Sequence, residues 1–131
     1  MAYNLNLEVE TFEAGTTDAP LAQFRAVVLN ASAQVEYPAG RQTIGVVGIT
    51  QDNLGAAQGD AVQVGPALVG GRTKVEAGEA IAVGEYVCFG ADGRALDADT
   101  TGDIYYGQAL EAASAAGEII TIKFSYLGVA P

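Results

Sequence analysis

The chain has 131 residues, half of them hydrophobic, which is long enough for one domain with a sizeable core and too apolar for disorder throughout. Sixteen acidic and six basic residues give a net charge of −10, a poor match for a phosphate backbone, so nucleic-acid binding is not expected. The sequence has no histidine, which excludes Ser-His and Cys-His catalytic pairs and removes the commonest zinc ligand.

Residues 3–12 alternate between apolar and polar side chains, the period-two pattern of a half-buried strand. Because it lies close to the terminus, such a strand can add to the edge of a sheet on a neighbouring protein. It can also form an internal edge strand of this domain, and the sequence leaves both alternatives open. We therefore expect an N-terminal strand or arm over residues 1–14, followed by a single β domain over residues 15–131. If the segment binds a partner, the expected contact residues are Asn4, Leu5, Leu7, Val9 and Phe12.

The N-terminus has neither the positive charge nor the apolar stretch of a secretory signal peptide. No apolar segment approaches the roughly 20 residues that a helix needs to cross a bilayer. We expect a soluble protein that is made in the cytoplasm and has no membrane partner.

Short runs rich in β-branched and aromatic residues, separated by turn residues, fill the rest of the chain and predict many short strands. Gly48, inside one run, predicts a bulge or a close backbone approach, and the pair Asp92 and Gly93 predicts a tight hairpin turn. Tyr105 and Tyr106 are neighbours on an expected strand, so one should face the core and the other the surface. The expected strands are residues 24–30, 43–50, 60–64, 86–89, 104–107 and 118–127.

Two segments share one sequence pattern. In residues 45–64 and in residues 104–122, a glycine is followed after seven residues by Ala-Ala, then by a glycine with an acidic neighbour and an alternating apolar run. The match extends upstream, where residues 26–35 align with residues 86–95. Internal repetition constrains a whole fold, so the sequence predicts one unit written twice. The predicted copies are approximately residues 25–64 and 85–122.

Residues 108–116 are good helix formers, but their counterpart in the other copy contains Asn53 and Gly55 and would make a poor helix. Duplicated units should follow the same backbone path, so we expect at most one short helix. The sequence therefore predicts an all-β fold, a compact barrel or sandwich of short antiparallel strands.

Catalysis by paired carboxylates is not expected, because most acidic residues follow glycines or lie in turns, where side chains are normally solvated. No serine, lysine or cysteine lies in a recognisable nucleophile motif, so we expect neither enzyme activity nor a cofactor. The single cysteine, Cys88, lies in an apolar run and should be a small buried side chain. The carboxylates that follow glycines include Asp60, Glu79, Glu85 and Glu118.

The acidic loop 97–103 places Asp97, Asp99 and Asp103 within a few residues of one another, close enough to wrap a calcium ion. The loop departs from the EF-hand pattern, which requires further acids and a closing Glu. We therefore expect a solvated acidic turn and no metal.

Residues 78–124 carry a family resemblance. Their sequence, GEAIAVGEYVCFGADGRALDADTTGDIYYGQALEAASAAGEIITIKF, resembles the tailed-phage capsid cement, or head decoration, proteins. In that family a turn like AGEAIAVGEYV precedes a DGR turn, and a glycine-led segment like GQALEAASAAGE opens a final strand. The resemblance implies a non-enzymatic, β-rich protein on the outside of the expanded icosahedral head. Such proteins commonly form homotrimers and clamp neighbouring major capsid subunits.

Two other functions remain open. The chain could be another part of the virion, such as the base of a head fibre or a tail protein. It could also be a small β-clip module that binds a ligand, because the AGEAIAVGEYV turn resembles one in the antifreeze-like domains attached to sugar-acid enzymes.

Overall fold

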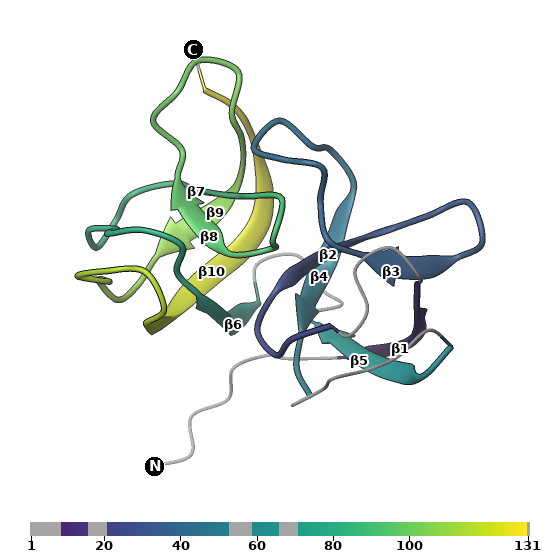
Figure 1. Ribbon diagram of the computed structural model, residues 1–131. Helices are drawn as coiled ribbons and strands as arrows, with labels where there is room; N and C mark the ends of the chain where they lie inside the picture. The colour runs from purple at the N-terminus through teal and green to yellow at the C-terminus, as the bar shows by residue number, and fades with distance from the viewer. Residues whose placement is uncertain (1–8, 16–20, 53–58, 66–70, 131) are drawn as a thin grey trace.

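The computed structural model describes residues 9–15, 21–52, 59–65 and 71–130. Within these residues the chain forms strands joined by turns and contains no helix, which confirms the all-β prediction (Figure 1). Accordingly, no described segment is a helix that could cross a membrane. The strands are β1 (Glu10–Ala14), β2 (Ala26–Leu29), β3 (Gln34–Glu36), β4 (Val46–Thr50), β5 (Ala61–Gly65), β6 (Arg72–Glu76), β7 (Val87–Phe89), β8 (Ala95–Asp97), β9 (Ile104–Ala109) and β10 (Ile119–Val129).

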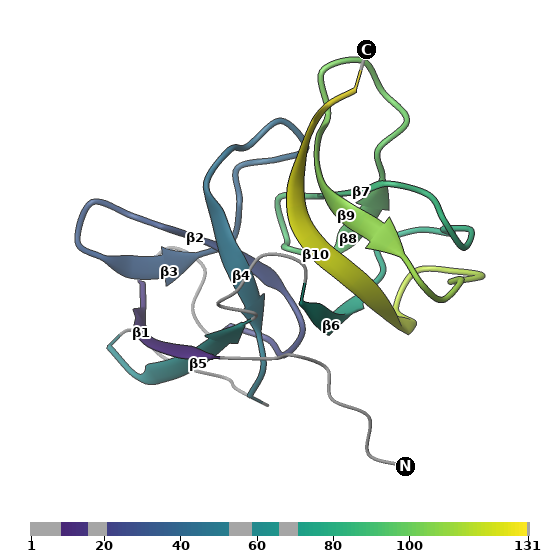
Figure 2. The same cartoon turned by 180° about the vertical axis from the view of Figure 1, so that it is seen from behind.

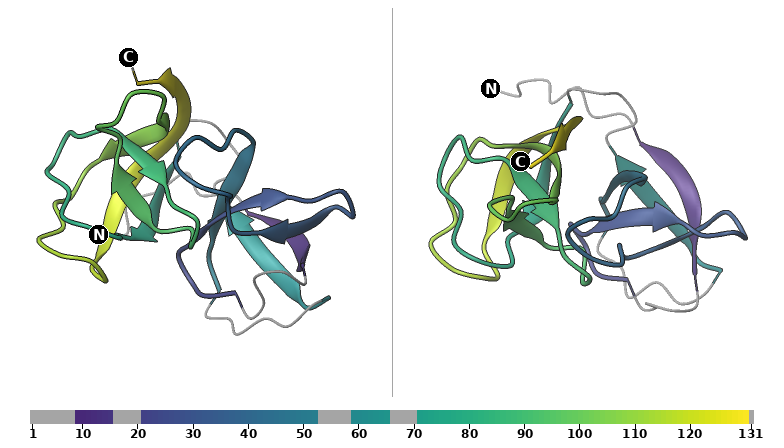
Figure 3. Two further views of the ribbon diagram at one scale, coloured as in Figure 1. Left: turned by 45° about the horizontal axis from the view of Figure 1, so that its top comes forward. Right: turned by 90° about the horizontal axis from the view of Figure 1, so that it is seen from above.

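The strands form two units that lie side by side, β1–β5 in the first unit and β6–β10 in the second (Figures 2 and 3). The first unit closes into a barrel in the order β1-β3-β2-β4-β5. In the second unit, β6-β10-β9 form one sheet and β7-β8 another. Backbone bridges between Ala77 and Ala95 and between Tyr86 and Gln108 join these sheets. The strands of the second unit therefore follow the same order as those of the first.

The two units also share their backbone hydrogen bonds. The N–H of Asn30 donates to the carbonyl of Gln34 at 2.8 Å and closes the β2–β3 hairpin. The N–H of Gly90 donates to the carbonyl of Arg94 at 3.0 Å and closes the β7–β8 hairpin in the same way. Antiparallel pairing of β4 with β5 is repeated by β9 with β10. The predicted duplication is confirmed in the backbone.

The duplication begins further upstream than the sequence comparison reached. Gly15 and Gly78 each end the triplet Glu-Ala-Gly. The N–H of Gly15 donates to the carbonyl of Val35 at 2.9 Å, and the N–H of Gly78 donates to the carbonyl of Ala95 at 2.7 Å. Both triplets lie beside a parallel pairing, β1 with β3 in the first unit and Ala77 with Ala95 in the second. β1 and β6 are therefore equivalent strands.

β1 contains residues 10–14 of the segment expected to be a strand or arm. It pairs antiparallel with β5 and parallel with β3, and so closes the first barrel. Residues 1–8 lie outside the described part of the chain.

Two clusters of buried apolar side chains form the core of the described residues. One cluster lies inside the first barrel. The other fills the second unit and includes Ala26 and Ile49 of the first unit, so it also joins the two units. Three stacked rings, with centroids 5.9 to 6.4 Å apart, lie in this second cluster. Each buried side chain of this size contributes about 1.5–3 kcal/mol. The rings are those of Phe89, Tyr106 and Phe124.

Gly48 in β4 and Gly107 in β9 each permit a close backbone approach, as predicted for Gly48. A Cβ on Gly48 would lie 2.9 Å from the carbonyl oxygen of Gly65. At the equivalent Gly107, a Cβ would lie only 1.8 Å from the carbonyl oxygen of Lys123. No side chain fits at that distance, so β9 and β10 can pair there only through a glycine.

Candidate functional site

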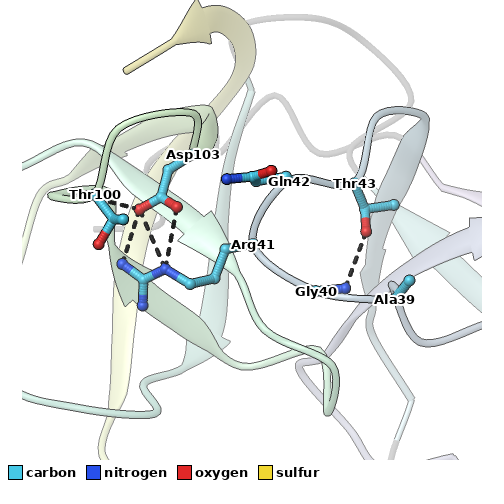
Figure 4. Close-up of a pocket in the computed structure, with 7 residues that line it drawn as sticks. All are labelled: Ala39, Gly40, Arg41, Gln42, Thr43, Thr100 and Asp103. Atoms are coloured by element: carbon cyan, nitrogen blue, oxygen red, sulfur yellow. Dashed lines mark hydrogen bonds and ion pairs between the residues drawn. The ribbon is translucent and has the colours of Figure 1, made fainter. Parts of the chain in front are cut away.

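The acidic loop 97–103 surrounds an arginine from the other unit. Arg41, in the turn before β4, places its Nη2 2.8 Å from Asp103 Oδ2 (Figure 4). The same Nη2 lies 3.0 Å from Asp99 Oδ1. Its Nε donates to Asp103 Oδ1 at 3.1 Å, and Nη2 also donates to the backbone carbonyl of Asp97 at 2.6 Å. The guanidinium of Arg41 thus lies against the acidic loop that the sequence offered as a possible calcium site.

The expectation of a solvated acidic turn is wrong for Asp103, whose side chain is only 1% exposed. The turn brings this carboxylate inward because the N–H of Thr100 donates to Asp103 Oδ2 at 3.1 Å. Burial alone would raise the pKa of Asp103, but the hydrogen bonds from Arg41 and Thr100 outweigh it and hold that pKa below its usual range. The same hydrogen bond with Asp103 raises the pKa of Arg41. Both groups therefore stay charged.

The turn that carries Arg41 is the first-unit copy of the turn that carries Asp103. In the first unit, the N–H of Gly40 donates to Thr43 Oγ1 at 3.0 Å, as the N–H of Thr100 does to Asp103. A hollow of about 460 Å³ is lined by residues of both turns. Because Arg41 is engaged with carboxylate and carbonyl oxygens, this hollow presents no free cation, and its polar groups hold the units together.

A second arginine also links the units. Arg25, just before β2, donates from Nη1 to the backbone carbonyl of Asp92 at 3.0 Å, and its Nη2 lies 3.3 Å from Glu76 Oε2. Arg94 reaches the same Glu76 oxygen at 3.5 Å and pairs with Asp92 at 2.8 Å. Beside this cluster the N–H of Ala26 donates to the carbonyl of Gly93 at 2.8 Å. The predicted turn at Asp92 and Gly93 is thus part of the contact between the units.

The carboxylates that follow glycines act as turn caps. Glu79 Oε2 accepts a hydrogen bond from the N–H of Asp97 at 2.8 Å, and Glu85 Oε1 accepts one from the N–H of Ala82 at 3.2 Å. Glu118 accepts hydrogen bonds from the N–H and the hydroxyl of Ser114. These contacts stabilise turns.

Burial raises the pKa of Asp97 to about 7, with further contributions from its hydrogen bond to Glu85 and from the charge of Glu85. The described residues nevertheless contain no group of His, Cys, Asp and Glu side chains arranged to hold a metal ion. Cys88 is buried, and this burial raises the pKa of its thiol to about 12, so the side chain behaves as the small hydrophobe that was expected.

The residues expected to bind a partner differ in their surroundings. Val9 is 44% exposed, immediately before β1. Phe12 lies opposite Val62 and packs against the core of the first barrel, where it is partly buried. The other three, Asn4, Leu5 and Leu7, lie outside the described residues.

A surface that the sequence analysis missed lies on the second unit. We name it the basic–aromatic face: it is the outer side of β6, β10 and β9 together with the residue just before β7. Its aromatic part is the stacked pair Tyr86 and Tyr105, with ring centroids 4.8 Å apart. In the sequence, Arg72 and Lys74 alternate with apolar or small residues, which indicates that both lie on one side of a strand. Which residues of the adjacent strands lie beside them depends on strand register. The members are Arg72, Lys74, Lys123, Gln108, Tyr86 and Tyr105.

The fold resembles that of a solved phage protein. The structure described as "head fiber gp8.5 N base in bacteriophage phi29" matches with a TM-score of 0.66 and 22% sequence identity, over 92% of this chain and 98% of that one. At this identity the likeness concerns the fold alone. No curated protein sequence matches the chain.

The sequence model of the phage cement protein family matches residues 9–124, a span that includes both units from just before β1 into β10. The match agrees with the resemblance found in residues 78–124 and extends it to the first copy of the repeat. The chain therefore belongs to the phage cement protein family, a family of structural proteins associated with the phage capsid.

Proposed function

We propose that this protein binds the outer surface of the expanded phage head and stabilises the contacts between major capsid subunits. The observation that carries the proposal is the family match, which includes both copies of the duplicated unit. The architecture supports it, since two β units locked together by Arg41 and Asp103 form a stiff body. Many copies of a stiff body, each making modest contacts, strengthen a lattice through multivalency.

The proposed partner is the major capsid protein, and the proposed location is the capsid exterior after synthesis in the host cytoplasm. A homotrimer is part of the proposal, and its expected mass in solution is three times the 13.4 kDa of one chain. The N-terminal segment contributes to binding through the residues that precede β1, which add as a strand to a neighbouring protein. Neither nucleic acid, nor a membrane, nor a catalytic step has a part in this function.

The test uses expanded, undecorated heads of the phage mixed with the purified protein. We expect a saturable number of bound copies per head and an increase in the temperature at which the heads release their DNA. Absence of binding to the heads would contradict the proposed function. Binding without any increase in head stability would remove the cementing role.

The likeness to a head fibre base favours one alternative, that this chain anchors a fibre to the head. A fibre base would bind heads without raising their resistance to heat, and it would bind at few sites per head. Counting bound copies in the experiment above therefore separates the two functions.

A further inference from the structure

Three basic side chains lie together on the basic–aromatic face. In the pairing of β6 with β10, Arg72 is directly opposite Lys123, and Lys74 is opposite Thr121. Residues directly opposite in antiparallel strands point to the same side of the sheet. All three basic side chains are exposed. The face thus concentrates half of the six basic residues of a chain whose net charge is −10.

Among the described residues these three cations form no ion pair, and the charge of Lys74 contributes, after hydrogen bonding with Thr121, to lowering the pKa of Glu111. The ion pairs of the described residues involve the other three basic residues, Arg25, Arg41 and Arg94, all at or beside the contact between the units. Arg72 and Lys123 face each other instead, and like charges directly opposite one another destabilise a sheet. The juxtaposition of Arg72 and Lys123 therefore does not stabilise the sheet.

The first unit provides an internal comparison, because its equivalent strands have the same pairing. Thr11 lies opposite Gln63 in the first unit as Lys74 lies opposite Thr121 in the second. Two residues earlier along the chain, Val9 corresponds to Arg72. A strand pair of this fold thus forms without basic residues on its outer side, so the basic residues of the second unit are not a requirement of the architecture.

The aromatic part of the face adjoins the basic part. Gln108 lies opposite Lys123 in β10 and is bridged on its other side to Tyr86, which stacks on Tyr105. Tyr86 is 46% exposed although it is a large aromatic residue. Tyrosine and arginine are both enriched at protein interfaces, and Tyr86 with Arg72 places the two types on this face.

In the first unit, the surface equivalent to this aromatic part is already an interface. Ala26 and Ile49, the counterparts of Tyr86 and Gln108, are fully buried in the cluster that joins the two units. Val46, the counterpart of Tyr105, packs against the same cluster. The same side of the repeated unit thus docks on a protein surface in the first copy, whereas in the second copy Tyr86 stays 46% exposed among the described residues.

We propose that the basic–aromatic face is the surface by which this protein docks on the capsid, and that it binds an acidic patch of the capsid lattice. The inference rests on the proposed function and specifies its contact. The charge distribution selects this occupant, since a chain of net charge −10 as a whole repels an acidic partner, whereas the three exposed cations of this face attract one. Tyr86 and Tyr105 supply the apolar anchor, and the cations set the orientation.

The decisive variant replaces the three cations, R72Q/K74Q/K123Q, and lowers the net charge by three. A matched control, S32E/A91E/A115E, lowers the net charge by the same amount at exposed turn positions away from the face. Both are mixed with expanded, undecorated heads, and bound copies are measured against protein and salt concentration. Thermal unfolding verifies that each variant folds.

We expect the neutral variant to bind heads about tenfold more weakly, as three exposed charge pairs imply. Its binding should respond less to salt than that of the original protein, since exposed pairs are screened by ions. The control should bind within about a factor of two of the original protein. Tyr86→Ser should weaken binding without changing the salt response.

Three outcomes would overturn the inference and leave the proposed function standing. If the neutral variant binds heads like the original protein, the face is not the contact and the proposed function stands. If the control loses as much affinity as the neutral variant, net charge and not this face is responsible. The third outcome is that the original protein binds a DNA duplex of about 20 base pairs through these three cations, while its binding to heads does not need them. In that case the face serves nucleic acid. Heads left bare by the original protein would remove the proposed function together with the inference.

Discussion

Arg41 and Asp103 join the two copies of the repeat through equivalent turns that have diverged. Asp103 occupies the position of Thr43 in the first copy, and it keeps the same turn hydrogen bond while adding a negative charge. Arg41 meets that charge at 2.8 Å, and the N–H of Ile104 donates to the carbonyl of Arg41 at 3.0 Å. A substitution that leaves the turn unchanged has thus created a lock between duplicated units.

Replacing Arg41 by methionine should destabilise the protein strongly. The substitution leaves the Asp103 carboxylate buried without its partner, which costs about 3 kcal/mol or more in the free energy of unfolding. Urea unfolding followed by tyrosine fluorescence measures the loss. The matched control is Asp99→Asn, which removes another partner of Arg41, but one that is 64% exposed; it should cost less than about 1 kcal/mol. Equal losses in the two variants would contradict the assignment of Asp103 as the main partner.

Stability should fall between about pH 4 and pH 7 through Asp97. Burial, and then the contact with Glu85, raise the pKa of Asp97 to about 7, whereas an Asp in an unfolded chain titrates near about 3.9. The folded protein therefore holds more protons than the unfolded chain in this range, and the free energy of unfolding decreases as the pH rises through it. We expect a change of about 1–2 kcal/mol, because this side chain is screened by solvent.

Below about pH 4 the sign reverses. The lowered pKa of Asp103 means that its contribution to stability is present above the unfolded value and is lost as the pH falls through the folded one. Urea unfolding at several pH values should give a maximum near about pH 4 to 5. Asp97→Asn should flatten the curve between about pH 4 and 7 and keep the loss at lower pH. A wild-type curve that is flat, or an Asp97→Asn variant with the original slope, would refute the role of Asp97.

Gly107→Ala should prevent the pairing of β9 with β10. A Cβ at this position would lie 1.8 Å from the carbonyl oxygen of Lys123, and backbone cannot move that far without breaking the ladder. We expect a loss of at least about 3 kcal/mol or no folded protein at all. Gly40→Ala is the control, because its added Cβ meets nothing within 4 Å; its stability should change by less than about 0.5 kcal/mol. Circular dichroism during heating distinguishes the variants.

Two deletions separate the N-terminal segment from the barrel. Removing residues 1–8 keeps β1, so the melting temperature should stay within a few degrees while binding to heads weakens if the segment adds to a neighbour. Removing residues 1–14 also takes away β1, its pairing with β5 and the core contact of Phe12, and should abolish cooperative unfolding. A deletion of residues 1–14 that melts like the full chain would show that the first barrel does not need β1.

Most of the fold was accessible from sequence because each element depends on local patterns. Alternation predicted the strands, Asp92 and Gly93 predicted a turn, and the comparison of the two copies correctly argued against a helix over residues 108–116. The Glu-Ala-Gly triplets that end at Gly15 and Gly78 indicated a longer repeat. The sequences that follow the two triplets differ, and this difference hid the alignment.

The functional surfaces were less accessible, because they depend on contacts distant in sequence. Asp103 was expected to be solvated since nothing near it in the sequence pairs with it, and Arg41 is 62 residues away. In the same way, Lys123 joins Arg72 only through the register of β10 with β6.

The sequence by itself determined that this chain is an all-β protein written in two copies with an excess of acidic residues, because periodicity, turn residues and composition act locally. Only the tertiary structure decided which side of each copy is covered. One unit can bury a given side against the other only once, so the first copy docks on the second, and the second keeps Tyr86 and its neighbouring cations exposed.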